Sequence, residues 1–395
     1  MRKDKLHILF VSHEYFDDEL PLAGGIGHFM YQLANELVKN GHDVTVMGFS
    51  SNSVHKIKGG VQLSFFKSTL SYVQLFYNWM ERILHFLGLS SWLIPFMVID
   101  RKRLAKKVEH FLREEQVDIV EVNDYVGDGA FLSIETPYIM RSHGSYTMLH
   151  KEAGFRRNDA FIYFEKLQSK KVKRGLGVSN FSSAMMKKYF QIKDIRTIYN
   201  GLDLSLYPYS KVKNTNRLLY FGTLSAAKGM DRLVQIFNGL IVVNPSLELI
   251  IAGKGKQYYK EKMYPGFSAS AKRQVRFLGY IDKASLVKEL DESSLVVFPS
   301  RIENFSLALL ETMACARMAV CWDIAAFKEV IEDGQNGCIV QDVDQAIDKI
   351  PKLLADKVEL QRVSDNARIT IEDHFTWEKV GQENIDYYKS CIVQK

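Results

Sequence analysis

Residues 300–311 read Ser-Arg-Ile-Glu-Asn-Phe-Ser-Leu-Ala-Leu-Leu-Glu. The apolar run from Leu295 to Phe298 comes just before them and indicates a buried strand, and Pro299 marks a turn. The apolar run from Leu307 to Ala316 is typical of a helix. The sequence therefore predicts a strand, a turn and a helix. Glu303 is expected in the loop at the carboxyl edge of a sheet, and Glu311 inside the helix.

The predicted helix start lies between these two glutamates. Its first backbone N–H groups, at Phe305, Ser306 and Leu307, have no helical partners and suit an anion such as a phosphate. The two carboxylates would be about 12 Å apart if the whole span were helical. This arrangement suits a ligand with a phosphate in its middle and hydroxyl-rich groups at each end, which is the shape of a nucleotide sugar. The alternative is a solvated loop carboxylate and a helix-surface glutamate.

Length and composition bound the class of protein. A chain of 395 residues exceeds a typical single core and predicts two domains. The net charge of +6 fits anionic ligands or an anionic membrane surface, and we expect no nucleic-acid partner. The four cysteines show no C-x-x-C spacing, so a structural zinc site or a disulfide framework is disfavoured. Without a signal-peptide layout at the N-terminus, we expect a cytoplasmic protein.

Strand-like and helix-like segments alternate along the chain, which predicts an α/β fold with parallel, doubly wound sheets. The pattern runs once before a linker at Asn200–Tyr209 and restarts after it. We therefore predict two tandem Rossmann-like domains, residues 1–203 and 204–375, with a helix at 376–395 that packs back on the first. The predicted strands are Leu6–Ser12, Asp43–Gly48, Asp118–Val122, Tyr138–Arg141, Leu218–Gly222, Leu247–Gly253, Val275–Leu278, Leu295–Phe298 and Met318–Trp322.

Glycine-bearing or charged loops follow many of these strands. Ligands of open α/β sheets bind at the carboxyl ends of the strands, and with two domains we expect the loops to face one another across a cleft. The candidate loops are Gly24–Gly27, His143–Gly144, Gly222–Gly229, Gly253–Gly255 and Glu303–Leu307.

The first glycine loop departs from a dinucleotide fingerprint. Gly24-Gly25-Ile26-Gly27 has Met30 where G-x-G-x-x-G needs its third glycine, so nicotinamide or flavin binding is disfavoured. Its glycines still permit close approach of the backbone to a ligand, although a plain flexible loop explains them equally well.

Two further side chains are candidates for function. Lys228, in the loop from Gly222 to Gly229, supplies a mobile positive charge for a phosphate. A lysine close to a helix start without a ligand would be electrostatically unfavourable, which favours a functional role. His143 stands at a predicted strand end inside the proposed cleft, and we prefer a functional role to a structural one.

We expect no metal site. Asp342-Val343-Asp344 resembles a metal-binding D-x-D, but it precedes a predicted helix at Gln345–Leu354, so capping explains it better. His13-Glu14 lacks the second histidine of a zinc-protease motif.

The segment from Ile83 to Ile99 has no charged side chain and is followed by five basic residues up to Lys107. It is shorter than the roughly 20 apolar residues of a spanning helix. Three interpretations fit it: an interfacial membrane segment, a buried helix pair of the first domain, and an apolar groove for a lipid-linked acceptor.

Over almost its whole length the chain resembles the retaining glycosyltransferases of family 4, which have the GT-B fold. The E-x7-E pattern from Glu303 to Glu311 is the most specific element of the resemblance. Asn200-Gly201-Leu202-Asp203 is similar to the interdomain motif of that family, and Phe221–Gly229 to its phosphate loop.

The resemblance implies sugar transfer from a nucleotide-diphosphate sugar, UDP- or GDP-linked, to a carbohydrate or lipid-linked carbohydrate acceptor, without a cofactor or a metal. It implies that Glu303, His143 and Lys228 are catalytic. Peripheral attachment to the inner face of the plasma membrane through Ile83–Lys107 would suit polysaccharide or glycolipid assembly. The donor-binding residues would be Gly24, Gly25, Gly222, Thr223, Lys228, Gly279, Tyr280, Asn304, Phe305, Ser306, Leu307 and Glu311.

One position departs from the family pattern. Thr223 stands where the family usually has an arginine that helps to hold the diphosphate. Either Lys228 and the helix start carry the diphosphate, or another basic residue substitutes, or activity is diminished. The rival interpretations are a GT-B glycoside phosphorylase, an oxidoreductase and a non-catalytic subunit that keeps the fold.

Overall fold

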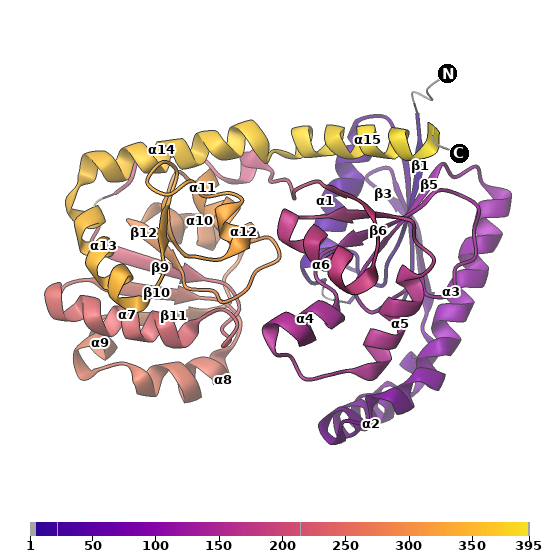
Figure 1. Cartoon of the computed structure of the whole chain (residues 1–395), viewed down its shortest axis with the longest axis horizontal. Helices are drawn as coiled ribbons and strands as arrows, with labels where there is room; N and C mark the ends of the chain where they lie inside the picture. Colours follow the sequence, from indigo (N-terminus) through magenta and orange to yellow (C-terminus); the bar gives the residue numbers. More distant parts are fainter. Residues whose placement is uncertain (1–4, 22, 214, 394–395) are drawn as a thin grey trace. The chain divides into compact units, whose positions relative to one another are not determined.

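The computed structural model describes residues 5–21, 23–213 and 215–393, apart from the side chains of residues 72–78 and 393. The chain divides into two compact units (Figure 1). Unit 1 runs to Asn200 and resumes at Trp377, and unit 2 runs from Gly201 to Thr376. Each unit is a Rossmann-like α/β body around a largely parallel sheet, which confirms the predicted fold class.

The sheet of unit 1 has the strand order β3-β4-β2-β1-β5-β6-β7-β8, and only the β3–β4 pair is antiparallel. The central strand β1 pairs with β2 on one side and β5 on the other, so the strand order reverses there. The strands are β1 (His7–Val11), β2 (Asp43–Ser50), β3 (Val54–Lys58), β4 (Val61–Lys67), β5 (Ile119–Asn123), β6 (Tyr138–Ser142), β7 (Arg174–Gly177) and β8 (Asp194–Thr197).

Helices cover both faces of this sheet (Figure 1). They are α1 (Gly25–Lys39), α2 (Gln74–Leu87), α3 (Ile94–Glu114), α4 (Tyr146–Ala153), α5 (Asp159–Ser169), α6 (Asn180–Phe190) and α15 (Trp377–Val393), with 3-10 turns η1 (Thr69–Val73) and η2 (Ser90–Leu93). The run Gly24–Gly27 was predicted as a loop, yet α1 already starts inside it at Gly25. Glu14 accepts from the N–H groups of Gly24 (3.1 Å) and Gly27 (3.4 Å), and this carboxylate lets the helix begin inside the glycine loop.

Helix α15 belongs to the core of unit 1. Trp377, Val380 and Tyr388 pack in one cluster with side chains of β1, β2 and α1. Arg141 is fully buried and pairs with Glu121 at 2.6 Å, while Asn384 and Tyr388 of α15 accept further bonds from its guanidinium. A buried charge needs such partners, so α15 completes this cluster.

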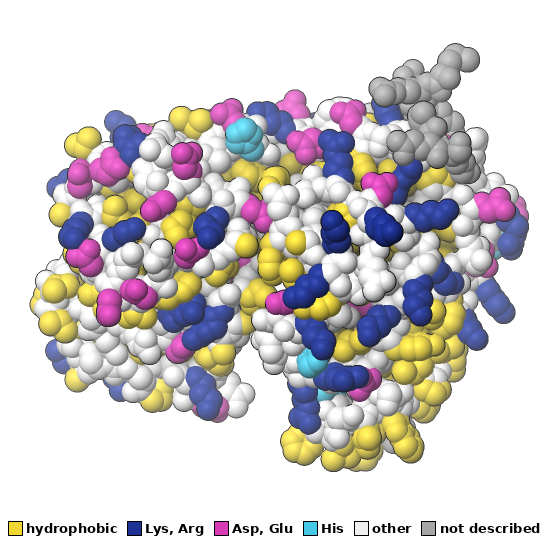
Figure 2. Space-filling view, in the orientation of Figure 1, with side chains coloured by type: hydrophobic (Ala, Val, Ile, Leu, Met, Phe, Trp, Pro, Cys, Tyr) yellow, Lys and Arg dark blue, Asp and Glu magenta, His cyan; other side chains and the backbone are white. Residues whose placement is uncertain are grey.

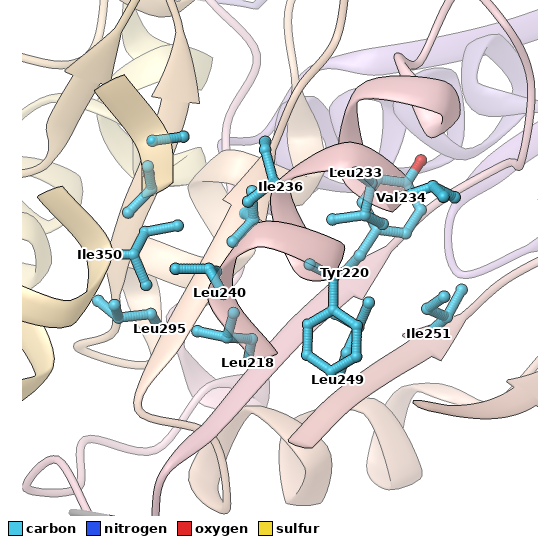
Figure 3. Packing of buried hydrophobic residues seen from close by; sticks show 14 of the residues in the cluster. Leu218, Tyr220, Leu233, Val234, Ile236, Leu240, Leu249, Ile251, Leu295 and Ile350 are labelled. Carbon is cyan, nitrogen blue, oxygen red and sulfur yellow. The ribbon is translucent and has the colours of Figure 1, made fainter. Parts of the chain in front are cut away.

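The sheet of unit 2 is fully parallel, with the order β11-β10-β9-β12-β13-β14. Hydrophobic side chains of the strands pack against α7 and α13 in one core (Figure 3). The strands are β9 (Arg217–Phe221), β10 (Glu248–Ala252), β11 (Val275–Gly279), β12 (Leu295–Phe298), β13 (Met318–Trp322) and β14 (Cys338–Val340). The helices are α7 (Met230–Val243), α8 (Lys256–Tyr258), α9 (Ala269–Gln274), α10 (Lys283–Asp291), α11 (Leu307–Ala314), α12 (Ala325–Lys328), α13 (Val343–Ala355) and α14 (Lys357–His374).

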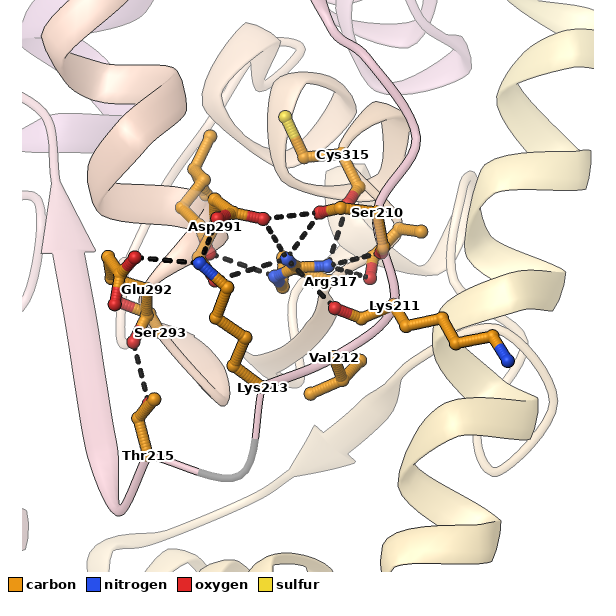
Figure 4. A network of polar contacts seen from close by, with 12 residues as sticks. Ser210, Lys211, Val212, Lys213, Thr215, Asp291, Glu292, Ser293, Cys315 and Arg317 are labelled. Carbon is orange, nitrogen blue, oxygen red and sulfur yellow. Dashed lines mark hydrogen bonds and ion pairs between the residues drawn. The ribbon is translucent and has the colours of Figure 1, made fainter.

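Arg317 connects the segment before β9 to the sheet of unit 2 (Figure 4). Its fully buried guanidinium donates to the carbonyl oxygens of Ser210 (2.9 Å) and Leu290 (2.8 Å) and pairs with Asp291 at 3.1 Å. Burial lowers the pKa of Arg317, while Asp291 favours its charged form. Arg317, directly before β13, therefore holds the residues before β9 together with other contacts, such as the Lys213–Glu292 ion pair at 2.7 Å.

Candidate functional site

The strand order of unit 2 reverses at β9, which pairs with β10 on one side and β12 on the other. Loops that leave such a switch point diverge and open a crevice at the carboxyl ends of the strands. The loops after β9 and β12 contact each other there, because the Arg301 N–H donates to the Ala227 carbonyl at 2.8 Å. Gly229 has φ +69°, and a Cβ on it would lie 1.9 Å from the Pro299 carbonyl, so only glycine fits.

Lys228 and Glu303 form an ion pair across these two loops, with Nζ 2.6 Å from Oε2. The hydroxyl of Ser300 donates to the other carboxylate oxygen of Glu303 at 2.8 Å. The Glu303 side chain is 9% exposed and that of Lys228 33%, so both are held at the mouth of the crevice. The two predicted catalytic residues of this unit are thus neighbours in space.

Helix α11 starts beside this pair. Ser306 is its N-cap and accepts from the Leu309 N–H at 3.3 Å, so the strand–turn–helix prediction is confirmed, with Glu303 in the loop and Glu311 in the helix. Asn304, Phe305 and Leu307 line the same approach to the helix, and the helix dipole places partial positive charge there.

Glu311 is held by two side chains that sequence reasoning missed. The Tyr207 hydroxyl donates to its Oε1 at 3.0 Å, and Lys283 forms an ion pair with the same oxygen. The Lys283 ammonium also lies 5.2 Å from the centroid of the Tyr207 ring. Burial, followed by the charge of Glu311, raises the pKa of Tyr207, so its hydroxyl stays a donor. The sequence signal for Lys283 is its position three residues after Tyr280, which was predicted to bind the donor.

The remaining predicted residues of unit 2 lie at neighbouring strand ends. Thr223 is exposed, and its carbonyl accepts from Tyr220 at 3.1 Å. The Gly279 carbonyl accepts from the Gly253 N–H at 2.7 Å, and a Cβ on Gly253 would lie 1.8 Å from the Gly222 carbonyl. Tyr280 is 72% exposed, which leaves its ring available to stack on a base.

Three predicted site residues, Gly24, Gly25 and His143, lie in unit 1. The His143 N–H donates to Asp124 at 2.9 Å, and its ring lies edge-on to Phe29 at 4.5 Å. Burial and then the charge of Arg141 lower the pKa of His143 to about 3, so the imidazole is neutral at neutral pH. Because Glu14 occupies the N–H groups at the start of α1, a phosphate role for Gly24 and Gly25 stays a prediction.

Unit 1 also contains a pocket of about 770 Å³ at the carboxyl ends of β1, β2 and β5. His13 stands in it, with Nδ1 2.6 Å from Asp128 and its ring between Phe49 and Tyr125. Burial alone would lower the pKa of His13, but the Asp128 charge and hydrogen bond raise it above its ordinary value. His13 was considered in the sequence only as part of an incomplete zinc-protease motif, so its pairing with Asp128 was not predicted.

Other predictions concern metals and membranes. Within residues 5–21, 23–213 and 215–393, no three His, Cys, Asp or Glu side chains are grouped to hold a metal ion. Asp342 caps α13 by accepting from the Gln345 N–H at 2.8 Å, which confirms the capping interpretation. No helix in the described part of the chain is long and apolar enough to cross a membrane.

Both units match known families of one enzyme class. Residues 23–206 match the family model described as Glycosyltransferase Family 4, and residues 215–356 match the model described as Glycosyl transferases group 1. With two Rossmann-like units that these two models match in turn, the chain is a GT-B glycosyltransferase of this family 4/group 1 type.

Similar proteins span nearly the whole chain. A glycogen synthase of Mycobacterium tuberculosis is 23% identical over 97% of this chain and 94% of its own. Sucrose-phosphate synthase from Thermosynechococcus elongatus superimposes with a TM-score of 0.75 and 17% identity, over 99% of this chain and 100% of its own. Anabaena HepE, solved with UDP and glucose, gives a TM-score of 0.71 and 17% identity, over 98% and 100%.

Proposed function

We propose that this protein transfers a hexosyl group from a UDP- or GDP-linked sugar to a hydroxyl group of a carbohydrate or glycolipid acceptor, with retention of anomeric configuration. Assembly of a cell-envelope polysaccharide or glycolipid is the setting we propose. The similarity to a glycogen synthase and to a protein solved with UDP and glucose supports a nucleotide-sugar donor.

One observation carries the proposal: a cation, a helix start and a partly buried carboxylate are aligned along α11. Lys228 lies before the helix, beside Glu303, and Glu311 lies inside it at 14% exposure. A diphosphate placed between them would meet the Lys228 ammonium and the N-terminal N–H groups of α11. Glu311 would then accept hydrogen bonds from the ribose hydroxyls, and the exposed Tyr280 ring would stack on the base.

Bond cleavage places negative charge on the leaving diphosphate. The bond from the anomeric carbon to the diphosphate oxygen breaks, and both electrons leave with the diphosphate. The acceptor oxygen forms its new bond on the same face, and its proton passes to the departing phosphate oxygen. Lys228 and the helix start stabilise that charge without a metal in this scheme, and Glu303 orients the hydroxyls of the sugar. The neutral His143 contributes hydrogen bonds rather than charge.

The test is a thermal-shift screen with UDP, GDP, ADP and CMP and their sugar conjugates, on wild type and Glu311→Ala. A ligand that binds only the folded state raises the melting temperature with the logarithm of its concentration. We expect a shift with one uridine or guanosine nucleotide that Glu311→Ala abolishes. Retention is then tested by NMR of the anomeric proton in the product. A product with inverted configuration would overturn the mechanism.

Thr223 favours a second candidate, a GT-B subunit that binds sugars without transferring them. This exposed, uncharged side chain stands on the loop that would cover the diphosphate. A thermal shift without turnover of any donor would support that candidate. The absence of any shift would contradict sugar binding as well, and would leave a scaffold subunit that keeps the fold without binding a nucleotide sugar as the leading function.

A further inference from the structure

Helices α2 and α3 and the segment between them, which includes η2, expose a set of large apolar side chains. We call this set the aromatic ridge: Trp79, Ile83, Phe86, Leu87, Leu89, Trp92, Phe96 and Ile99. Trp79, Phe86 and Trp92 are 60%, 72% and 69% exposed. Figure 2 shows hydrophobic side chains gathered over the region that α2 occupies in Figure 1. Apolar patches of this kind mark interaction surfaces.

The ridge is separate from the hydrophobic core, because the opposite face of the same helices packs against buried side chains. Met80 and Leu84 of α2, with Leu93 and Met97, contact the cluster that contains Phe164. The buried-helix interpretation of this segment is therefore right for one face only. A second apolar face remains, which folding of the unit does not use.

Exposed charge around the ridge is basic. Between Trp79 and Lys107 the acidic residues are Glu81, which lines the pocket, and Asp100, which is 3% exposed and accepts from the Thr69 N–H at 2.7 Å. The Arg156 guanidinium lies 5.2 Å from the Phe86 ring. Exposed cations in the described part of this region are Arg82, Lys102, Arg103, Lys106, Lys107, Arg156 and Arg157. Two of them have acidic partners, since Arg103 pairs with Asp100 at 3.5 Å and Arg157 pairs with the partly exposed Asp159 at 2.6 Å. Aromatic and aliphatic side chains beside exposed lysine and arginine are typical of helices that lie in the interface of an anionic bilayer.

The same two helices form a wall of the pocket in unit 1. Glu81 of α2 and Met97 and Arg101 of α3 line the pocket, whereas their neighbours Ile83 and Phe96 belong to the ridge. A helix with its side chains is about 10–12 Å across, so the pocket and the ridge are separated by about that distance. A headgroup in the pocket would meet hydroxyl, carboxylate and aromatic groups, including the stacked ring of His13.

We propose that the aromatic ridge docks on an anionic lipid bilayer and holds the pocket close to its surface, where it receives the hydroxyl-bearing headgroup of a membrane-borne acceptor. The membrane contact stands by itself, and the acceptor's place in the pocket rests on the proposed function. The occupant of the ridge is lipid rather than protein, because basic side chains flank it and its acidic neighbours are turned inward.

The experiment is sedimentation of the full chain with phosphatidylcholine vesicles, with and without roughly one quarter phosphatidylglycerol. We expect binding to the anionic vesicles that weakens at high salt. Phe86→Ser/Trp92→Ser should reduce the partition coefficient at least about tenfold. The matched control is Val242→Ser/Val243→Ser, which removes two equally exposed apolar side chains from α7 and should leave binding unchanged.

Tryptophan fluorescence locates the contact. Trp79 and Trp92 are on the ridge, while the other two tryptophans, Trp322 and Trp377, are 7% and 8% exposed. Brominated lipids should quench wild type and fail to quench Trp79→Ser/Trp92→Ser. Sedimentation without quenching would overturn the proposal, as would equal binding by the ridge variant. A wild-type dimer that becomes monomeric in Phe86→Ser/Trp92→Ser would identify a protein interface instead.

The two proposals fail separately. Donor binding is tested by the thermal shift with UDP or GDP, to which the ridge variants should respond like wild type. Vesicle binding without any nucleotide shift would contradict the proposed sugar transfer but support the membrane contact. A nucleotide shift without vesicle binding would support sugar transfer but contradict the membrane contact.

Discussion

The hydroxyl group of Tyr207 donates to the carboxylate of Glu311 at 3.0 Å, although 104 positions separate the two residues in the sequence. Tyr207 comes from the segment before β9 and Glu311 from α11, and both belong to unit 2. The bond fixes the rotamer of the carboxylate that we propose holds the ribose. Tyr207 is thereby a positioning residue for donor binding.

Removal of this bond should weaken nucleotide binding moderately. Tyr207 positions Glu311 without touching the nucleotide, and Lys283 still holds the carboxylate, so Tyr207→Phe should cost about 1 kcal/mol and lower UDP or GDP affinity about fivefold. Glu311→Ala removes a charged acceptor and should lower it about a hundredfold. Isothermal titration calorimetry measures both. Tyr209→Phe, which removes a surface bond to Asp365, is the control and should bind like wild type. Unchanged UDP or GDP affinity in Tyr207→Phe would show that Tyr207 does not contribute to nucleotide binding.

Lys228 and Glu303 should separate in their kinetic effects. Lys228→Ala removes the cation that stabilises the leaving diphosphate and should lower kcat/KM about a hundred- to thousandfold. Glu303→Ala should lower kcat/KM with the sugar donor, yet leave the affinity for the free nucleotide within about threefold, because Glu303 is proposed to contact the sugar alone. Steady-state kinetics and calorimetry distinguish these outcomes, with the exposed Lys262→Ala as the control. Equal loss of free-nucleotide binding in Glu303→Ala would contradict its assignment.

Thr223→Arg should tighten donor binding. Thr223 is exposed on the loop that leads to Lys228, so an arginine there can reach a diphosphate without displacing core side chains. A charge-assisted bond contributes about 1.5–3 kcal/mol, and at this exposed position we expect the lower end of that range, which is about tenfold higher affinity at low salt and less at high salt. Thr223→Met gives the added size without the charge and should bind like wild type. A gain shared by both variants would show that charge is not the cause.

The His13–Asp128 pair predicts a pH dependence of stability. The pKa of His13 is higher in the folded protein than in the unfolded one. The pair therefore stabilises the folded state fully below the unfolded pKa of about 6.5, and this stabilisation is lost as the pH rises through the folded pKa. The free energy of unfolding of Asp128→Asn should therefore fall furthest below wild type near about pH 6, and the difference should shrink by about pH 9. Urea denaturation at both pH values measures it. The exposed His110→Asn should show no such trend.

Arg317 should be the most sensitive polar side chain of unit 2. Its removal leaves buried carbonyl oxygens and the Asp291 carboxylate without their donor, and loss of one partner from a buried charged cluster costs about 3–5 kcal/mol. Arg317→Met should lower the free energy of unfolding by about the lower figure, since methionine keeps part of the packing. Chemical denaturation checks this, with the exposed Arg276→Met as the control. If Arg317→Met changed the free energy of unfolding by less than about 1 kcal/mol, it would resemble an ordinary surface substitution, and Arg317 would not have this stabilising role.

Periodicity predicted the fold well where the strands are buried and continuous. Leu295–Phe298 and Met318–Trp322 were predicted with the bounds that the structure has. The strands β7 and β8 were missed because each has a single large apolar residue, Leu176 and Ile195, which is too little for an apolar pattern. The β3–β4 ribbon was missed because only Val54 of its outer strand is buried, so that strand carries no apolar pattern.

For the site, local motifs were readable and distant partners were not. Lys228 and Glu303 stand in loops between a strand and a helix, and Glu311 stands inside the helix that follows, all places that sequence signals mark. Tyr207 and Lys283 act on Glu311 through contacts that only the folded sheet creates. The His13–Asp128 dyad joins residues 115 positions apart, and nothing near either residue in the sequence indicates the other.

Helix α15 has a consequence for how the protein is made. The ribosome releases the strands of unit 1 first, then all of unit 2, and only then the helix that partners Arg141 and closes the core around Trp377 and Tyr388. Unit 1 must wait through the synthesis of residues 201–376 with that core open, whereas unit 2 is contiguous and has every strand it needs before α15 emerges. The second unit is therefore free to fold while the first is still incomplete, and a chain cut before Trp377 would expose a core rather than merely lose a tail.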